Sequence, residues 1–146
     1  MTVRSFRDLD VYKRMYDAML IVAKTILPGL PKEEKFSLID QMRRASKAPL
    51  AIIAEGYAKK NYRKDWLKYI NDAIGECNEM VAHLSCCRDL YPDRLDVKIL
   101  DKLINEYDIS GKQLYRLGES WRSKGMRDEG KPNPTPILDP QPTTHP

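Results

Sequence analysis

The sequence predicts an all-α protein, an antiparallel four-helix bundle whose helices run up-down-up-down. Four stretches carry apolar residues in alternating steps of three and four, the spacing that gathers them on one face of a helix. The connections between these stretches are short and contain proline, glycine or asparagine. No stretch shows the strict apolar and polar alternation that is typical of a half-buried strand.

The first helix is expected to begin near Asp8, which is a suitable N-cap residue. It should end at Leu27–Pro31, where two prolines and a glycine interrupt the pattern. Its expected core stripe is Leu9, Tyr12, Tyr16, Met19, Ala23 and Ile26.

The second helix is expected to run from Pro31 to about Gly56. Pro49 lies in its middle, where it removes one backbone hydrogen bond at a cost of roughly 3 kcal/mol. We interpret Pro49 as the cause of a bend that lets the helix contact both the core and another subunit. The expected core stripe is Leu38, Ile39, Met42, Ala45, Pro49, Ile52 and Ile53.

The face of the second helix opposite this stripe carries small residues, Ala51, Ala54 and Ala58. Small side chains permit close helix approach, so these alanines are predicted to form an oligomer interface. The alternative is that alanine, the best helix former, fills an indifferent surface.

The third helix is expected after a cap at Asn61, and the fourth runs from a cap at Asp93 to a stop at Gly125. The bundle should therefore occupy residues 1–125. Residues 126–146 hold six of the ten prolines and are predicted to be a disordered tail. The core residues expected in these two helices are Trp66, Leu67, Ile70, Ala73, Ile74, Cys77, Met80, Val81, Leu84, Cys87, Leu100, Leu103, Tyr107, Ser110, Leu114, Leu117 and Trp121.

The cations are unevenly distributed. Between Gln41 and Lys68, eight cations face only Glu55 and Asp65, a net charge of +6 in a chain whose total is +4. A local basic block of this kind is typical of nucleic-acid binding, with a solvated helix face as the alternative. Interleaved aromatic residues could stack on bases, although Trp66 fits the edge of the core better. The predicted nucleic-acid-binding residues are Arg43, Arg44, Lys47, Lys59, Lys60, Arg63, Lys64 and Lys68.

Residues suited to catalysis or metal binding are sparse. The chain has no Gly-rich phosphate loop, no Ser-His-Asp set and no Glu-x-x-His pairs of the kind that hold two iron ions in a helical bundle. His83 lies near Cys77, Cys86 and Cys87, but this spacing matches no standard zinc pattern. We therefore expect neither an enzyme nor a metal or other cofactor.

The predicted location is the cytoplasm. No apolar run is long enough to span a membrane, and no basic-then-apolar leader begins the sequence. An odd number of cysteines, three, argues against a disulfide framework, so reduced thiols are expected.

Three segments, FRDLDVY at 6–12, QMRRA at 41–45 and IAEG at 53–56, together resemble the bacterial four-helix-bundle proteins encoded in 23S ribosomal RNA intervening sequences. The resemblance covers residues 6 to about 123. The chain departs from that family's run of Ser, Ile-Pro, Ser and Asn, so no polar site is carried over from it. The residues in those places are Ala48, Pro49, Leu50, Ala51 and Ile52.

Shorter segments, LPK at 30–32, FSL at 36–38 and LGESWRS at 117–123, are similar to the related accessory variability determinants of diversity-generating retroelements. This second resemblance implies a basic, barrel-shaped homopentamer that binds RNA or DNA and a reverse transcriptase and has no catalytic residues. A structural oligomer whose basic block meets an acidic protein remains the alternative.

Overall fold

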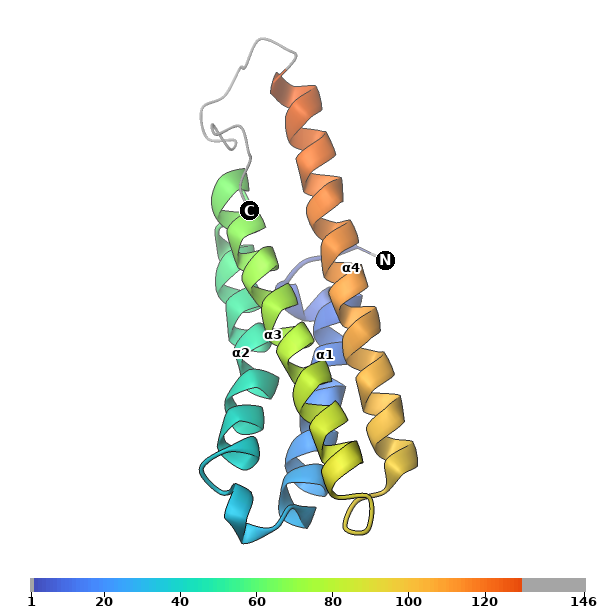
Figure 1. Ribbon diagram of the computed structural model, residues 1–146. Helices are drawn as coiled ribbons and strands as arrows, with labels where there is room; N and C mark the ends of the chain where they lie inside the picture. Colours follow the sequence, from blue (N-terminus) through green and yellow to red (C-terminus); the bar gives the residue numbers. More distant parts are fainter. Residues whose placement is uncertain (1, 130–146) are drawn as a thin grey trace.

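A computed structural model describes residues 2–129 of the protein, with side chains described as far as Ser123 (Figure 1). Four long helices form it: α1 (Asp10–Ile21), α2 (Leu38–Ala58), α3 (Arg63–Leu90) and α4 (Val97–Glu129). No strand occurs within 2–129, so the prediction of an all-α protein is confirmed for this part of the chain.

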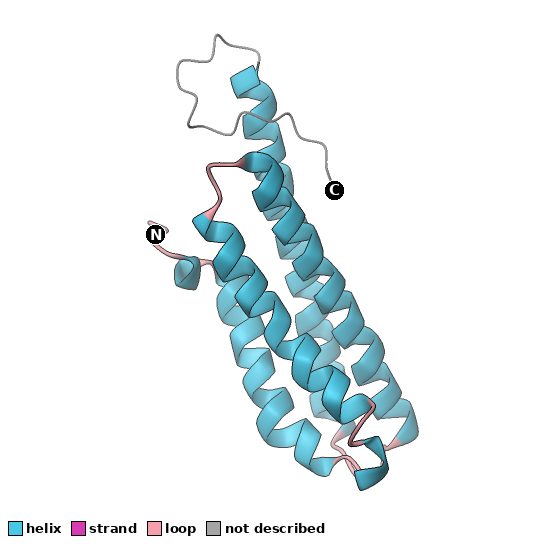
Figure 2. Ribbon diagram, turned by 90° about the vertical axis from the view of Figure 1, so that its left-hand side faces the viewer, coloured by secondary structure: helices cyan, strands magenta, loops and turns pink. Residues whose placement is uncertain are grey.

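The four helices lie lengthwise beside one another (Figures 1 and 2). The α1–α2 and α3–α4 connections lie at one end, and the α2–α3 connection lies at the other, where α4 extends beyond it. This places the two halves of α2 near opposite ends of the protein.

A single hydrophobic core runs between the helices. In α2, α3 and α4 most residues of the expected stripes are buried, including the interior proline Pro49, and the rest pack against the core half-buried. The helical assignment of α2 is unbroken across this proline. The largest completely buried side chains include Trp66 and Tyr107.

In α1 the centre of the core stripe lies one residue position before the expected one, although Ile26 is buried and Leu9, Tyr12 and Met19 pack against the core half-buried. The buried residues are Val11, Met15, Ala18, Val22 and Ile26, whereas Tyr16 is 43% exposed and Ala23 is exposed. Two apolar stripes overlap on this helix. The aliphatic Val and Met side chains fill the centre of the core, whereas a tyrosine at the edge of the core can keep its hydroxyl in water. A π-helical turn at Val22–Ile26 then brings Ile26 back into the core.

Several helix boundaries also differ from expectation. Asp8 and Ser5 form a capping box on a short 3-10 turn, so Asp8 does not cap α1. The helix α2 begins at Leu38 because residues 27–34 form two 3-10 turns around Leu30 and Pro31. Tyr62 occupies the N-cap position of α3. The helix α4 continues through Gly125 to Glu129, and the rest of the predicted disordered tail lies outside the described residues.

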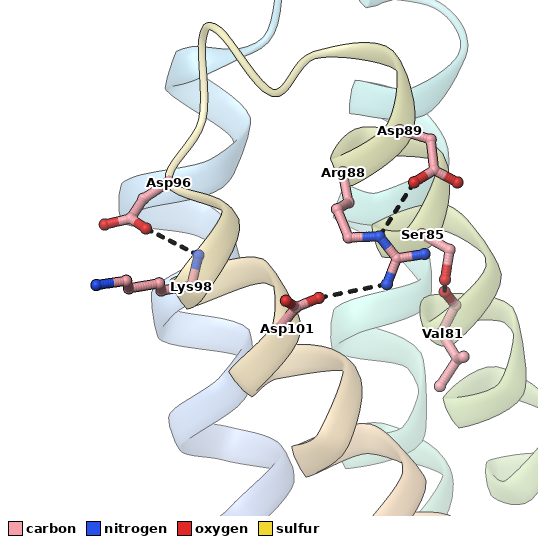
Figure 3. Close-up of polar contacts among 7 residues, drawn as sticks. All are labelled: Val81, Ser85, Arg88, Asp89, Asp96, Lys98 and Asp101. Atoms are coloured by element: carbon pink, nitrogen blue, oxygen red, sulfur yellow. Dashed lines mark hydrogen bonds and ion pairs between the residues drawn. The ribbon is translucent and has the colours of Figure 1, made fainter.

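The α3–α4 connection carries its own polar contacts (Figure 3). The carboxylate of Asp96, and not that of Asp93, accepts the Lys98 amide hydrogen at 2.9 Å and caps α4. The guanidinium of Arg88 lies 3.1 Å from the Asp89 carboxylate and 3.3 Å from that of Asp101, so it joins α3 to α4.

The same end is tied to the α1–α2 connection. The Tyr91 hydroxyl donates a hydrogen bond to the Glu34 carboxylate, and the Arg94 guanidinium donates one to the Gly29 carbonyl at 3.0 Å. These contacts hold two segments that are about 60 residues apart in sequence against each other.

Candidate nucleic-acid interface

The α2–α3 connection is a tight turn of four residues, from Lys59 to Tyr62. Its amides are satisfied locally, because Lys59 N donates to the Gly56 carbonyl and Tyr62 N donates to the Lys59 carbonyl, both at 2.9 Å. Such a turn fixes the flanking helix ends and places its own lysines, Lys59 and Lys60, on one corner of the bundle with the lysines at the start of α3.

We name the basic corner as the four lysines Lys59, Lys60, Lys64 and Lys68. Lys60 is half-buried, with its ammonium 4.3 Å from the centre of the Tyr57 ring, and the other three are exposed. Lys60 and Lys64 form no ion pair with any residue within 2–129, so both charges are available to an anion.

The other two lysines have carboxylate neighbours. Lys68 pairs with Asp72 at 2.9 Å, which raises the lysine pKa. Lys59 donates a hydrogen bond to the Tyr69 hydroxyl at 3.2 Å, which raises its pKa, and lies 3.9 Å from Glu55. Exposed ion pairs are worth about 0–1 kcal/mol, so a phosphate can compete for either ammonium.

Of the predicted binding residues, Arg63 differs from the rest, and Trp66 lies in the core as expected. Arg63 is only 4% exposed, so its guanidinium is not part of the exposed basic corner. Trp66 is 1% exposed and packs edge-on against Tyr57, with ring centres 6.0 Å apart, so its indole is a core residue. Tyr62 is 52% exposed and is the aromatic ring of the turn that a base can reach.

The remaining predicted cations, Arg43, Arg44 and Lys47, lie on the first half of α2. Twelve residues separate Lys47 from Lys59, which corresponds to roughly 18 Å along a helix. All three are exposed, and Asp40 lies 3.2 Å from Arg44 and 4.0 Å from Arg43. Without the buried Arg63, the other seven cations therefore form two surfaces, one on the first half of α2 and one where α2 is followed by α3, which a linear count of charge could not reveal.

The alanines of the predicted oligomer interface lie between these two surfaces on α2. Ala51 and Ala58 are exposed and Ala54 is half-buried. Methyl-sized side chains on an outer helix face leave the backbone accessible to close approach by another helix.

The cysteines and the histidine occupy separate environments. The thiols of Cys77 and Cys87 are buried against the sulfur atoms of Met15 and Met42, at 3.7 and 3.6 Å. Burial raises the pKa of both thiols to about 12. His83 lies 3.1 Å from Glu79 on the surface of α3. Within the described part of the chain, no three His, Cys, Asp or Glu residues converge on a position that could hold a metal ion.

One protein family matches most of the sequence. The family described as 23S rRNA-intervening sequence protein matches residues 7–116. The chain belongs to this family. Comparison with curated proteins and with solved structures gave no match. Among the helices within 2–129, none is both long and apolar enough to cross a membrane.

Proposed function

We propose that this family member is a non-catalytic, oligomeric accessory protein that binds RNA or DNA through the basic corner. The observation that supports this most directly is the pair Lys60 and Lys64, two cations without a carboxylate partner within 2–129 that stand two positions before and after the exposed Tyr62 in the sequence.

This arrangement suits a flexible strand. Lysine ammonium groups bind successive phosphates and release condensed counterions, and a tyrosine ring stacks on a base of any sequence. The helix ends that carry the lysines are fixed by the tight turn, so little conformational freedom is lost on binding.

The reverse-transcriptase partner is a further part of this proposal. It is supported by the resemblance of LPK, FSL and LGESWRS to retroelement accessory proteins. A reverse-transcriptase gene and a template repeat beside the gene for this protein would favour it. A position inside a split ribosomal RNA gene would favour the intervening-sequence role.

The binding proposal is tested by fluorescence anisotropy with labelled single-stranded RNA at 50 mM salt. We expect Lys60→Gln/Lys64→Gln to weaken binding at least tenfold. The matched control Lys13→Gln/Lys102→Gln removes two exposed lysines from α1 and α4 and should leave affinity within twofold. Equal affinity of both double variants would contradict the assignment of the basic corner.

A structural or protein-interaction oligomer is the alternative function, and the alanine face of α2 favours it. In that case an acidic protein would occupy the basic corner, and RNA would bind no better than an unstructured polyanion such as heparin. A competition titration with heparin separates the two functions.

A further inference from the structure

A groove lies at the end of the protein opposite the basic corner. It has a volume of about 450 Å³ and lies between the π-helical turn that follows α1, the α1–α2 connection and the first half of α2. Ligand sites in proteins commonly measure about 300–1,000 Å³, so the groove has the size of a small-molecule site.

Four cations line this groove: Lys32, Lys35, Arg43 and Lys47. No carboxylate is among the described residues that line it, and the three lysines form no ion pair within 2–129. Arg43 has only a distant contact to Asp40, at 4.0 Å. The groove therefore concentrates positive charge, which within 2–129 is offset only in part, by the Arg43–Asp40 pair.

The rest of the lining is largely apolar. Leu27, Leu30 and Ile39 contribute aliphatic side chains, and Ala23 leaves room beside them. Ser46, which is 1% exposed, adds a hydroxyl whose partner is the Arg43 carbonyl at a long 3.4 Å. An anion with a substantial apolar part fits this lining better than a small inorganic ion does.

An exposed aromatic ring, Phe36, follows the lining residue Lys35 in the sequence. Phe36 is 85% exposed, and the Lys35 ammonium lies 5.3 Å from the centre of its ring. Most of this ring's apolar surface is in water, and a flat apolar group stacked on the ring would remove part of that surface from water. The cation that lines the groove and the exposed ring are thus adjacent.

The groove walls are held in place. The α1–α2 connection is fixed to the α3–α4 connection by the bonds from Tyr91 to Glu34 and from Arg94 to Gly29. Leu30, which is 5% exposed, anchors the same connection in the core. The site is therefore preorganised, which reduces the entropic cost of binding.

We propose that this groove binds one nucleotide unit, with its phosphate on the four cations and its base against the apolar lining or Phe36. The unit is either a free mononucleotide or the phosphorylated end of a strand. This site is separate from the basic corner, and its existence does not depend on the proposed function of that corner.

The test is calorimetric titration of the full-length protein with adenosine monophosphate, adenosine and inorganic phosphate at 50 mM salt. We expect the monophosphate to bind at least tenfold more tightly than either part alone. Arg43→Gln/Lys47→Gln should lower that affinity at least tenfold. Ala23→Glu, which places an anion at an exposed position of the lining, should do the same without removing a cation.

The matched control is Lys60→Gln/Lys64→Gln, which removes two charges from the basic corner and should leave monophosphate affinity unchanged. If the wild-type protein does not bind the monophosphate, or if Arg43→Gln/Lys47→Gln binds it as tightly, the groove proposal is overturned. Loss of monophosphate binding in the corner variant alone would also overturn it, while supporting the corner as an anion site.

A second titration distinguishes the two sources of the nucleotide. It compares a single-stranded oligonucleotide carrying a 5′-phosphate with one that lacks it. A preference for the phosphorylated strand that disappears in Arg43→Gln/Lys47→Gln would identify a strand end. Monophosphate binding without such a preference would identify a free nucleotide.

Discussion

Gly56 and Tyr69 are packed so closely that a Cβ atom on Gly56 would lie 2.5 Å from the Cβ of Tyr69. This contact sets the separation of α2 and α3 at the basic corner. It also places the Tyr69 hydroxyl between Glu55 of α2 and Lys59 of the turn, where it donates to Glu55 at 3.0 Å and accepts from Lys59 at 3.2 Å. The position of the corner lysines therefore depends on a glycine that carries no charge.

The first prediction concerns this contact. Gly56→Ala should lower the free energy of unfolding by about 1–3 kcal/mol, the usual cost of overpacking, because Tyr69 and the backbone of α3 must move. Urea denaturation followed by circular dichroism measures the change. RNA affinity should fall as well, because Lys59 and Lys64 would no longer keep their relative positions.

The matched control is Gly75→Ala on the exposed surface of α3, where an added Cβ meets no atom within 4 Å. There only helix propensity changes, and we expect stabilisation of about 1 kcal/mol. Equal stabilisation of both variants would show that Gly56 is not constrained by Tyr69.

The second prediction concerns assembly. Ala51→Glu or Ala54→Glu should lower the mass measured by light scattering, because a charge buried at a close helix contact loses its solvation. Helix content should stay unchanged. Ala82→Glu, at an exposed alanine of α3, is the control and should keep the wild-type mass. Wild-type mass in all three variants would exclude the alanine face as the interface.

The third prediction concerns pH. Hydrogen bonds from Ser37 and Tyr91 hold the pKa of Glu34 below its ordinary value of 4.5, so their stabilising effect is present above pH 4.5 and is lost as pH falls through the lowered pKa. The same bond to Glu34 raises the pKa of Tyr91 to about 12, so its effect is present below pH 10 and is lost as pH rises toward 12.

Tyr91→Phe removes this hydrogen bond. The variant should be less stable than the wild type at pH 7, since the lost bond involves a charged carboxylate, and its stability should change less than that of the wild type between pH 5 and pH 3. Urea denaturation at the two pH values measures both effects. Tyr115→Phe, at a 61% exposed tyrosine, is the control. A pH dependence in Tyr91→Phe identical to that of the wild type would refute the linkage.

The fourth prediction concerns the thiols. At pH 8 a thiol reagent should modify Cys86 within minutes, because this thiol is exposed. Cys77 and Cys87 should not react in the folded protein, because both thiols are buried and their pKa values are raised to about 12. One thiol per chain should therefore react in the folded protein, and three should react in the denatured protein. Two or more equivalents from the folded protein would contradict the burial of Cys77 and Cys87.

The sequence predicted the all-α class and the core of three helices because their apolar spacing is continuous. It failed in α1, where two apolar stripes overlap and periodicity cannot choose between them. It also placed Arg63 among exposed cations, since burial depends on neighbouring helices that local spacing does not locate. The groove was missed because its cations come from two segments, Lys32 and Lys35 before α2 and Arg43 and Lys47 within it.

The salt dependence of RNA affinity tests the central claim most directly. Replacing Lys59, Lys60, Lys64 and Lys68 by Gln should make the slope of log K against log salt concentration shallower by about 3, since each phosphate contact on a single strand contributes roughly 0.7. The account predicts this change together with unaltered thermal unfolding. An unchanged slope in a folded variant would contradict the assignment of nucleic-acid binding to the basic corner.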